Sequence, residues 1–323
     1  MGIKGNSLDT VLRNLARVRD QERGYEEIKP LLLIPGGAMR GAAVNVGQIR
    51  ALQEEGFGDV FRNMIGISSG AAVAAYFATN NRDQILRSWD LVYKCIPNYV
   101  HPGITNIGRI FDTPGIEEEL RGGAYAPDLN SILESPHGLY FGVIVRKTGE
   151  FVLLRSGKDI FSKVRASMTI PWISRGKAII DGVEYLDGGF YPIPLDEIIK
   201  EFNPTDILIL SNKTQGQLDE QDALGKMLGI YIKKYPRDIR MKIARSHNQL
   251  ANLSKWVDRG VNVGVLFPPE TGIHGLTKNH EALRNAINVS YEDALKVIAG
   301  SPFRDDIVTE FANMARLGHS LEK

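Results

Sequence analysis

The sequence predicts a single α/β domain in which helices cover both faces of a mixed, mostly parallel sheet, a three-layer α/β/α arrangement. Two observations predict it. Short apolar runs without polar alternation recur along the chain, as expected of strands buried on both faces. Two of these runs pass through a glycine-containing turn into a helical pattern, and such units build parallel sheets. No proline- or serine-rich linker divides the 323 residues, so one domain is expected.

Two strand–turn–helix units open the apolar part of the chain. The run Leu31–Ile34 ends at a proline and two glycines, and residues 41–55 then place apolar side chains on one helical face and stop at Gly56. A second run, Asn63–Ile67, continues through a glycine-rich turn into the alanine-rich segment Ala71–Ala78. Each unit predicts a buried strand followed by a helix.

The later elements follow in chain order. Residues 98–136 are rich in glycine, proline and asparagine and are expected to loop out over the domain. Residues 139–145 and 151–154 flank a Thr-Gly pair and predict a hairpin. Further buried strands are expected at 207–210 and 261–267, and helices at 281–298 and 305–317.

Composition excludes several classes of protein. Apolar residues make up 43% and charged residues 24%, which is ordinary for a globular domain and excludes disorder, collagen and coiled coil. The net charge of +1 argues against a nucleic-acid binder. The single cysteine, Cys95, allows no internal disulfide. We expect a cytoplasmic protein, since no apolar stretch approaches the ~18–20 residues of a membrane span and the first residues lack a secretory signal.

The segment Gly66-Ile67-Ser68-Ser69-Gly70 has the pattern G-x-S-x-G. This pattern places a serine on a cramped turn between a strand and a helix, where glycines two residues to either side remove Cβ atoms that would collide. The preceding strand and the following alanine-rich helix supply the required context. Ser68 is therefore a candidate nucleophile, with a plain Gly/Ser turn as the alternative.

Gly36-Gly37-Ala38-Met39-Arg40-Gly41 lies between the first strand and its helix. A dinucleotide-binding loop is excluded because Pro35 stands where its first glycine belongs, and a Walker loop because Gly41 is followed by alanine. What remains is a run of amides near a helix N-terminus. It can hold a developing oxyanion or serve as a general anion nest.

Asp187-Gly188-Gly189 follows the stretch Val183–Leu186. An Asp-Gly pair is an ordinary hairpin turn. Two glycines beside a carboxylate also let another backbone segment approach that carboxylate closely. Both interpretations stay open on the residues alone.

Together these blocks resemble the patatin-like phospholipases. A fourth block, residues 164–171, is similar to the Ala-Ser-x-x-x-Pro block of that family and carries Ser167 and Pro171. The resemblance is strongest over residues 30–212. It implies a patatin-like catalytic domain over residues 30–300, preceded by a helical leader at 1–29 and followed by a helical tail at 301–323.

The resemblance implies a serine lipid acylhydrolase of the phospholipase A or lysophospholipase type. Its substrates are lipid esters, and it needs no cofactor, metal or calcium. By this resemblance, Ser68 and Asp187 are expected to form the catalytic dyad, and Gly188 and Gly189 to complete the loop of the proton acceptor. The residues of the oxyanion loop are Gly36, Gly37, Ala38 and Arg40, of which Arg40 helps to hold the loop. Pro35 and Pro192 depart from the family pattern, so loop geometry and substrate access are expected to differ from the family more than the chemistry does.

The catalytic base has a further requirement. A carboxylate with an ordinary pKa of about 4 is a poor base at neutral pH, so burial is expected to raise the pKa of Asp187. Trp172, beside Pro171, is expected to line the acyl pocket.

Two alternative functions remain. The first is an esterase with a Ser-His-Asp triad, in which His247, His274 or His280 completes Ser68 and Asp187. The second is a non-catalytic lipid-binding protein.

Residues 226–259 form a basic, amphipathic stretch. It holds nine lysines and arginines against two aspartates, and its apolar residues share a helical face. It is expected either to pack on the core or to bring a peripheral enzyme to an anionic membrane.

Overall fold

The computed structural model describes residues 7–106, 108–190, 193–218 and 259–300, together with residues 233, 235, 237, 240 and 241. The strands are β1 (Pro30–Ile34), β2 (Asn63–Ile67), β3 (Gly138–Val145), β4 (Phe151–Arg155), β5 (Ala178–Ile180), β6 (Val183–Asp187), β7 (Asp206–Leu210) and β8 (Asn262–Leu266). The longer helices are α1 (Leu8–Arg19), α2 (Ala38–Glu54), α3 (Ser69–Phe77), α4 (Arg82–Asp90), α5 (Thr113–Gly122), α6 (Leu129–Glu134), α7 (Ile160–Met168), α8 (Leu195–Phe202) and α12 (His280–Ala299).

All eight strands form one mixed sheet in the order β5-β6-β3-β2-β1-β7-β8, with β4 pairing on β3. The pairs β3–β2, β2–β1, β1–β7 and β7–β8 are parallel. The pairs that β3 makes with β4 and with β6, and the pair β5–β6, are antiparallel. The predicted mixed, mostly parallel sheet is confirmed.

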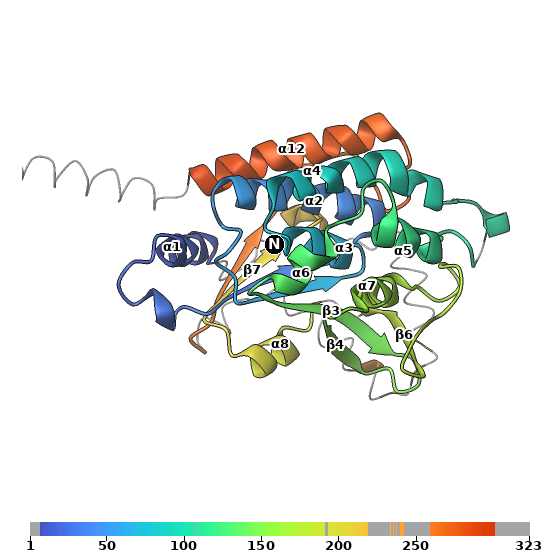
Figure 1. Cartoon of the computed structure of the whole chain (residues 1–323), viewed down its shortest axis with the longest axis horizontal. Helices are drawn as coiled ribbons and strands as arrows, with labels where there is room; N and C mark the ends of the chain where they lie inside the picture. The colour runs from blue at the N-terminus through green and yellow to red at the C-terminus, as the bar shows by residue number, and fades with distance from the viewer. Residues whose placement is uncertain are drawn as a thin grey trace, which may run out of the picture.

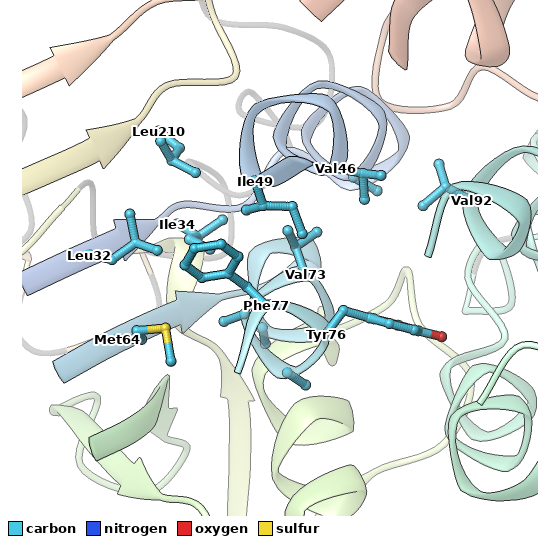
Figure 2. Packing of buried hydrophobic residues seen from close by; sticks show 14 of the residues in the cluster. Leu32, Ile34, Val46, Ile49, Met64, Val73, Tyr76, Phe77, Val92 and Leu210 are labelled. Carbon is cyan, nitrogen blue, oxygen red and sulfur yellow. The ribbon is translucent and has the colours of Figure 1, made fainter. Parts of the chain in front are cut away.

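The central strands are apolar on both faces, which explains their unbroken hydrophobic runs. Successive side chains of a strand point to opposite faces, so Leu32 and Ile34 join one core while Leu31 and Leu33 join the other. In Figure 2, Leu32 and Ile34 lie with Leu210 on the side of the sheet that carries α2 and α3. A buried leucine of this kind contributes about 1.5–3 kcal/mol relative to an exposed one.

Helices cover each face of the sheet, giving three layers (Figure 1). The helices α2 and α3 lie on one face, and α12 packs on the outer side of α2. This packing is close at Gly47, where a Cβ would lie 2.5 Å from the carbonyl oxygen of Ile287. On the other face α8 packs Leu195 and Ile198 against the strands.

Most of the predicted elements are confirmed, and one is wrong. The two strand–turn–helix units, the hairpin at 139–154, the strands near 207 and 261 and the helix near 281 all form. Residues 98–136 are not an extended loop, because they contain α5 and α6. Each of these helices begins at an aspartate, Asp112 or Asp128, whose side chain accepts a hydrogen bond from a backbone amide of the first turn.

The N-terminal leader contains the predicted helix α1. Its apolar side packs on β8, where Gly264 leaves space for Val11. The predicted tail at 301–323, including the helix at 305–317, lies outside the described residues. In the described part of the chain, no helix combines the length and apolarity needed to cross a bilayer.

Candidate active site

Ser68 lies at a strained turn between β2 and α3. Its φ is +55° and its ψ is −130°, a conformation that non-glycine residues rarely adopt and that costs about 1–3 kcal/mol. The glycines around it are required by space. A Cβ on Gly66 would lie 2.6 Å from Ala71 Cα, and one on Gly70 would lie 2.9 Å from the carbonyl oxygen of Pro35. The turn therefore has the geometry that the G-x-S-x-G pattern predicts.

The structure brings Ser68 and Asp187 together. Ser68 Oγ donates a hydrogen bond to Asp187 Oδ2 at 2.6 Å, across 119 residues of sequence. The backbone amide of Gly189 donates to Asp187 Oδ1 at 2.7 Å. Gly188 has no room for a side chain, because its Cβ would collide with the carbonyl group of Gly142. The close approach suggested by the Asp-Gly-Gly segment is therefore present.

Strand β3 explains how the two side chains meet. On one edge of β3, Ile67 of β2 pairs with Gly142, and Asp187 of β6 pairs with the next residue, Val143. The opposite edge is occupied by β4. The carboxyl ends of β2 and β6 thus meet along one edge of β3. Ser68, the residue that follows Ile67, therefore faces Asp187.

Ser167 holds the serine turn in place. Its hydroxyl accepts a hydrogen bond from the Ser68 amide at 2.9 Å and donates one to the Gly142 carbonyl at 2.7 Å. Ser167 is fully buried in α7. Sequence reasoning included Ser167 in the fourth block but assigned it no role. Nothing in the local pattern indicates that its hydroxyl bridges the turn after β2 and the strand β3.

The glycine loop lies directly beside Ser68. A Cβ on Gly36 would collide with Ser68 Cβ and would lie 2.9 Å from Ser68 Oγ. Helix α2 begins at Ala38, which has a φ of +49°, and the first amides of a helix have no partner within it. The Met39 amide already donates to the carbonyl of Gly275. The amides of Gly37 and Ala38 therefore stay the predicted oxyanion donors at this helix end.

Arg40 lies on the first turn of α2 but away from the serine. It lines a second pocket with Asn212 and residues 268–274, on the other side of the glycine loop. The structure therefore places Arg40 in this second pocket, and its part in holding the loop stays a prediction.

An apolar pocket opens beside Ser68. It contains about 690 Å³ of empty space, part of it open to solvent. Apart from Ser68 and Ser69, its walls come mainly from α2, α3, the segment 88–96 and the start of α5, and Met168 and Ile170 close it near Asp187. Trp172 is not part of the pocket; it is 45% exposed and lines another one, so its expected placement is wrong.

Burial sets the acidity of the carboxyl group. Asp187 is 3% exposed, and this burial raises its pKa to about 7. The hydrogen bonds from Ser68 and from the Gly189 amide favour the charged form and oppose the shift. A carboxyl group with this pKa can both accept and return a proton near neutral pH.

The described residues provide no histidine at this site. Ser68 and Asp187 hydrogen-bond to none of His101, His137, His274 and His280, and none of these lines the apolar pocket. His274 instead lines the pocket behind the glycine loop. His247 lies outside the described residues, as does most of the basic segment 226–259. In the described part of the chain, no three His, Cys, Asp or Glu side chains cluster as metal ligands.

A strained serine bonded to a buried carboxylate in an apolar pocket is the arrangement of a serine hydrolase. A family model described as patatin-like phospholipase matches residues 32–199, just over half of the chain. The chain belongs to the patatin-like phospholipase family, and at the level of that family it is a lipid acylhydrolase.

Solved structures similar to the chain include two with low sequence identity. One is VipD from Legionella pneumophila, at 14% identity and a TM-score of 0.40, with 85% of this chain and 67% of that chain covered. The other is human GIVD cytosolic phospholipase A2 in complex with methyl γ-linolenyl fluorophosphonate and terbium chloride. It has 12% identity and a TM-score of 0.43, with 92% of this chain and 62% of that chain covered. The chain thus spans less than two thirds of the human structure. A comparison with curated protein sequences found no match.

Proposed function

We propose that the protein hydrolyses carboxylic ester bonds of lipids through a Ser68–Asp187 dyad and an acyl-enzyme intermediate. The observation that carries the proposal is the 2.6 Å hydrogen bond from Ser68 Oγ to Asp187 Oδ2. It gives the hydroxyl proton an acceptor at the place where the oxygen would attack. The adjoining apolar pocket suits an acyl chain, because most of its wall is hydrocarbon.

In the proposed first half-reaction, Ser68 Oγ attacks the ester carbonyl carbon while its proton passes to Asp187. The carbonyl oxygen becomes an oxyanion beside the amides of Gly37 and Ala38. Each such donor typically contributes about 2.7–4 kcal/mol to the transition state. The carbon–oxygen bond to the alcohol then breaks, and the alcohol leaves with the proton held by Asp187.

In the second half-reaction, Asp187 takes a proton from water as that water attacks the acyl-serine. Collapse of the second tetrahedral intermediate frees the carboxylic acid, and Ser68 regains its proton from Asp187. Nucleophile, base and oxyanion donors all come from the chain, and calcium has no part in the proposed steps.

The direct test is the release of fatty acid from lysophosphatidylcholine micelles and from a short-chain p-nitrophenyl ester. We expect hydrolysis of both, with irreversible inhibition by an alkyl fluorophosphonate. Absence of hydrolysis together with absence of fluorophosphonate labelling would favour the non-catalytic lipid-binding alternative.

The pH dependence should follow the ionisation of Asp187. Only the carboxylate accepts a proton, so kcat/KM is expected to rise tenfold per pH unit below about 7 and to level off above it. Ionisation of a carboxylic acid absorbs little heat, whereas ionisation of an imidazolium absorbs much more. The midpoint of the pH profile should therefore shift little between about 10 and about 35 °C. A midpoint that falls steeply on warming would indicate a histidine base.

Removing the candidate triad histidines should leave the rate unchanged. We expect His247→Ala, His274→Ala and His280→Ala each to retain the wild-type kcat on the short-chain ester, because the Ser68 hydrogen bond already goes to Asp187. The purified variants are compared at matched folded concentration, checked by circular dichroism. A single inactive variant that is correctly folded would replace the dyad by a triad.

A further inference from the structure

Asn212 lies beside the glycine loop for a topological reason. In the sheet, β1 lies between β2 and β7, and all three strands are parallel. Their carboxyl ends therefore meet at one edge. Ser68 follows β2, Gly36 follows β1, and Asn212 follows β7 two residues beyond its end. This order places the glycine loop between the serine on one side and the asparagine on the other.

The side chain of Asn212 is bonded to that loop. Asn212 is 8% exposed, and its Nδ2 donates a hydrogen bond to the carbonyl oxygen of Gly36. The next residue also touches it, because a Cβ on Gly37 would lie 2.8 Å from Asn212 Cγ. The asparagine is itself held in place. The Ser211 amide bonds to the Leu266 carbonyl, and Gln48 Nε2 donates to the Ser211 carbonyl.

This hydrogen bond fixes the direction of an amide. The Gly36 carbonyl and the Gly37 N–H belong to the same trans peptide and point in opposite directions. With the carbonyl directed at Asn212, the Gly37 N–H points to the opposite side of the loop. Asn212 lines the pocket behind the loop, whereas Ala38 and Ser68 line the apolar pocket in front of it. The Gly37 N–H is therefore aimed toward the serine side.

Two consecutive glycines make such an anchor necessary. Glycine populates a wider range of backbone conformations than any other residue, so the Gly36–Gly37 peptide can rotate unless something holds it. Neither glycine can be replaced to stiffen the loop, since Ser68 and Asn212 occupy the space that each Cβ would need.

We propose that Asn212 is a positioning residue that directs the Gly37 N–H at the oxyanion of the reaction. The inference rests on the proposed ester hydrolysis by Ser68. It assigns to Asn212 no contact with the substrate and no proton transfer. Its effect is on the transition state alone, because the negative charge that the amide stabilises develops only there.

Two variants test the assignment. Asn212→Leu is close in size and lacks the donor, and Asn212→Asp keeps the shape but presents only acceptors at high pH. For both, kcat on the short-chain ester is expected to fall by between about 10-fold and 100-fold, less than the loss of a complete oxyanion donor, with KM nearly unchanged. The affinity for an alkyl trifluoromethyl ketone, which forms a tetrahedral adduct with serine, should fall by the same factor as kcat/KM.

Asn262→Leu is the matched control. Asn262 also donates a side-chain hydrogen bond, to Asp206 Oδ1 at 3.0 Å, but at the other end of β7. It should lower the unfolding temperature without changing kcat or ketone affinity per folded molecule. If a folded Asn212 variant keeps the wild-type kcat, or loses kcat without losing ketone affinity, the assignment is wrong.

The result is separable from the proposed function. If Ser68→Ala is inactive while both Asn212 variants react at the wild-type rate, the positioning inference fails and the hydrolytic function stands. If Ser68→Ala keeps its activity, the proposed function fails, and the assignment of Asn212 fails with it.

Discussion

Replacement of Ser68 by alanine is expected to abolish ester hydrolysis, lowering kcat by about 10⁴-fold or more. The hydroxyl is the group that attacks in the proposed reaction, and its hydrogen bond directs its proton at Asp187. The fold should be retained, since alanine removes one oxygen and leaves the Ser68 amide bonded to Ser167. The rate is measured as fatty acid released from lysophosphatidylcholine, and folding by thermal unfolding.

Ser69→Ala is the matched control for this variant. Ser69 is the next residue, its hydroxyl is buried, and it lines the same pocket, but Asp187 does not accept its proton. We expect Ser69→Ala to keep most of the activity. Equal loss in both variants would mean that the pocket, and not the nucleophile, had been damaged.

Replacement of Asp187 by asparagine should have two opposite effects, one on activity and one on stability. The amide cannot take up the serine proton, so kcat should fall by about 10³-fold or more. The same change removes a buried ionisable group. We therefore expect an inactive enzyme that is more stable than the wild type at neutral and alkaline pH.

The sign of the stability effect follows from the raised pKa. The Asp187 pKa is about 7 in the folded protein, against about 3.9 in an unfolded chain. In the wild type, the contribution of Asp187 to the free energy of unfolding is therefore fully present below pH ~4 and is lost as the pH rises to about 7. The reason is that the folded state keeps the proton to a higher pH than the unfolded state does. Over about three pH units the loss amounts to about 4 kcal/mol, which the variant avoids.

Urea unfolding of both proteins measures this difference. The series runs from about pH 4 to about pH 8 and so covers the unfolded and folded pKa values of Asp187. The gap in unfolding free energy should widen with pH and then level off. Asp206→Asn replaces another buried carboxylate of the sheet, one that bonds Asn14 and Asn262 far from Ser68. It should leave kcat per folded molecule unchanged. A constant gap between Asp187→Asn and wild type would contradict the burial argument.

The sheet could be predicted from sequence because its signal is local. Strands buried on both faces need unbroken apolar runs, and Leu31–Ile34 and Ile207–Leu210 are such runs. The helices α4, α7 and α8 were not predicted; each has only eight or nine residues. Short helices are stabilised mainly by tertiary packing. The composition of residues 98–136 wrongly predicted a loop, because aspartate caps start helices there among glycines and prolines.

The candidate site divides in the same way. Ser68, Asp187 and the glycine loop belong to short motifs whose spacing reflects local steric demands, and the structure brings these residues together. The contributions of Ser167 and Asn212 depend on which strands lie side by side, and no local pattern encodes that order. The meeting of β2 and β6 along one edge of β3 could not be predicted from a local pattern either, because it arises from strand register.

The most direct test of the dyad is to locate the covalent adduct of an alkyl fluorophosphonate by peptide mass spectrometry. In this reaction Ser68 Oγ bonds to phosphorus, fluoride leaves, and the serine proton passes to Asp187. We expect a single adduct, on Ser68, that forms at the wild-type rate when His247, His274 and His280 are all alanine and is nearly abolished in Asp187→Asn. An adduct on a different residue, or labelling that survives Asp187→Asn but disappears with the histidines, would contradict it.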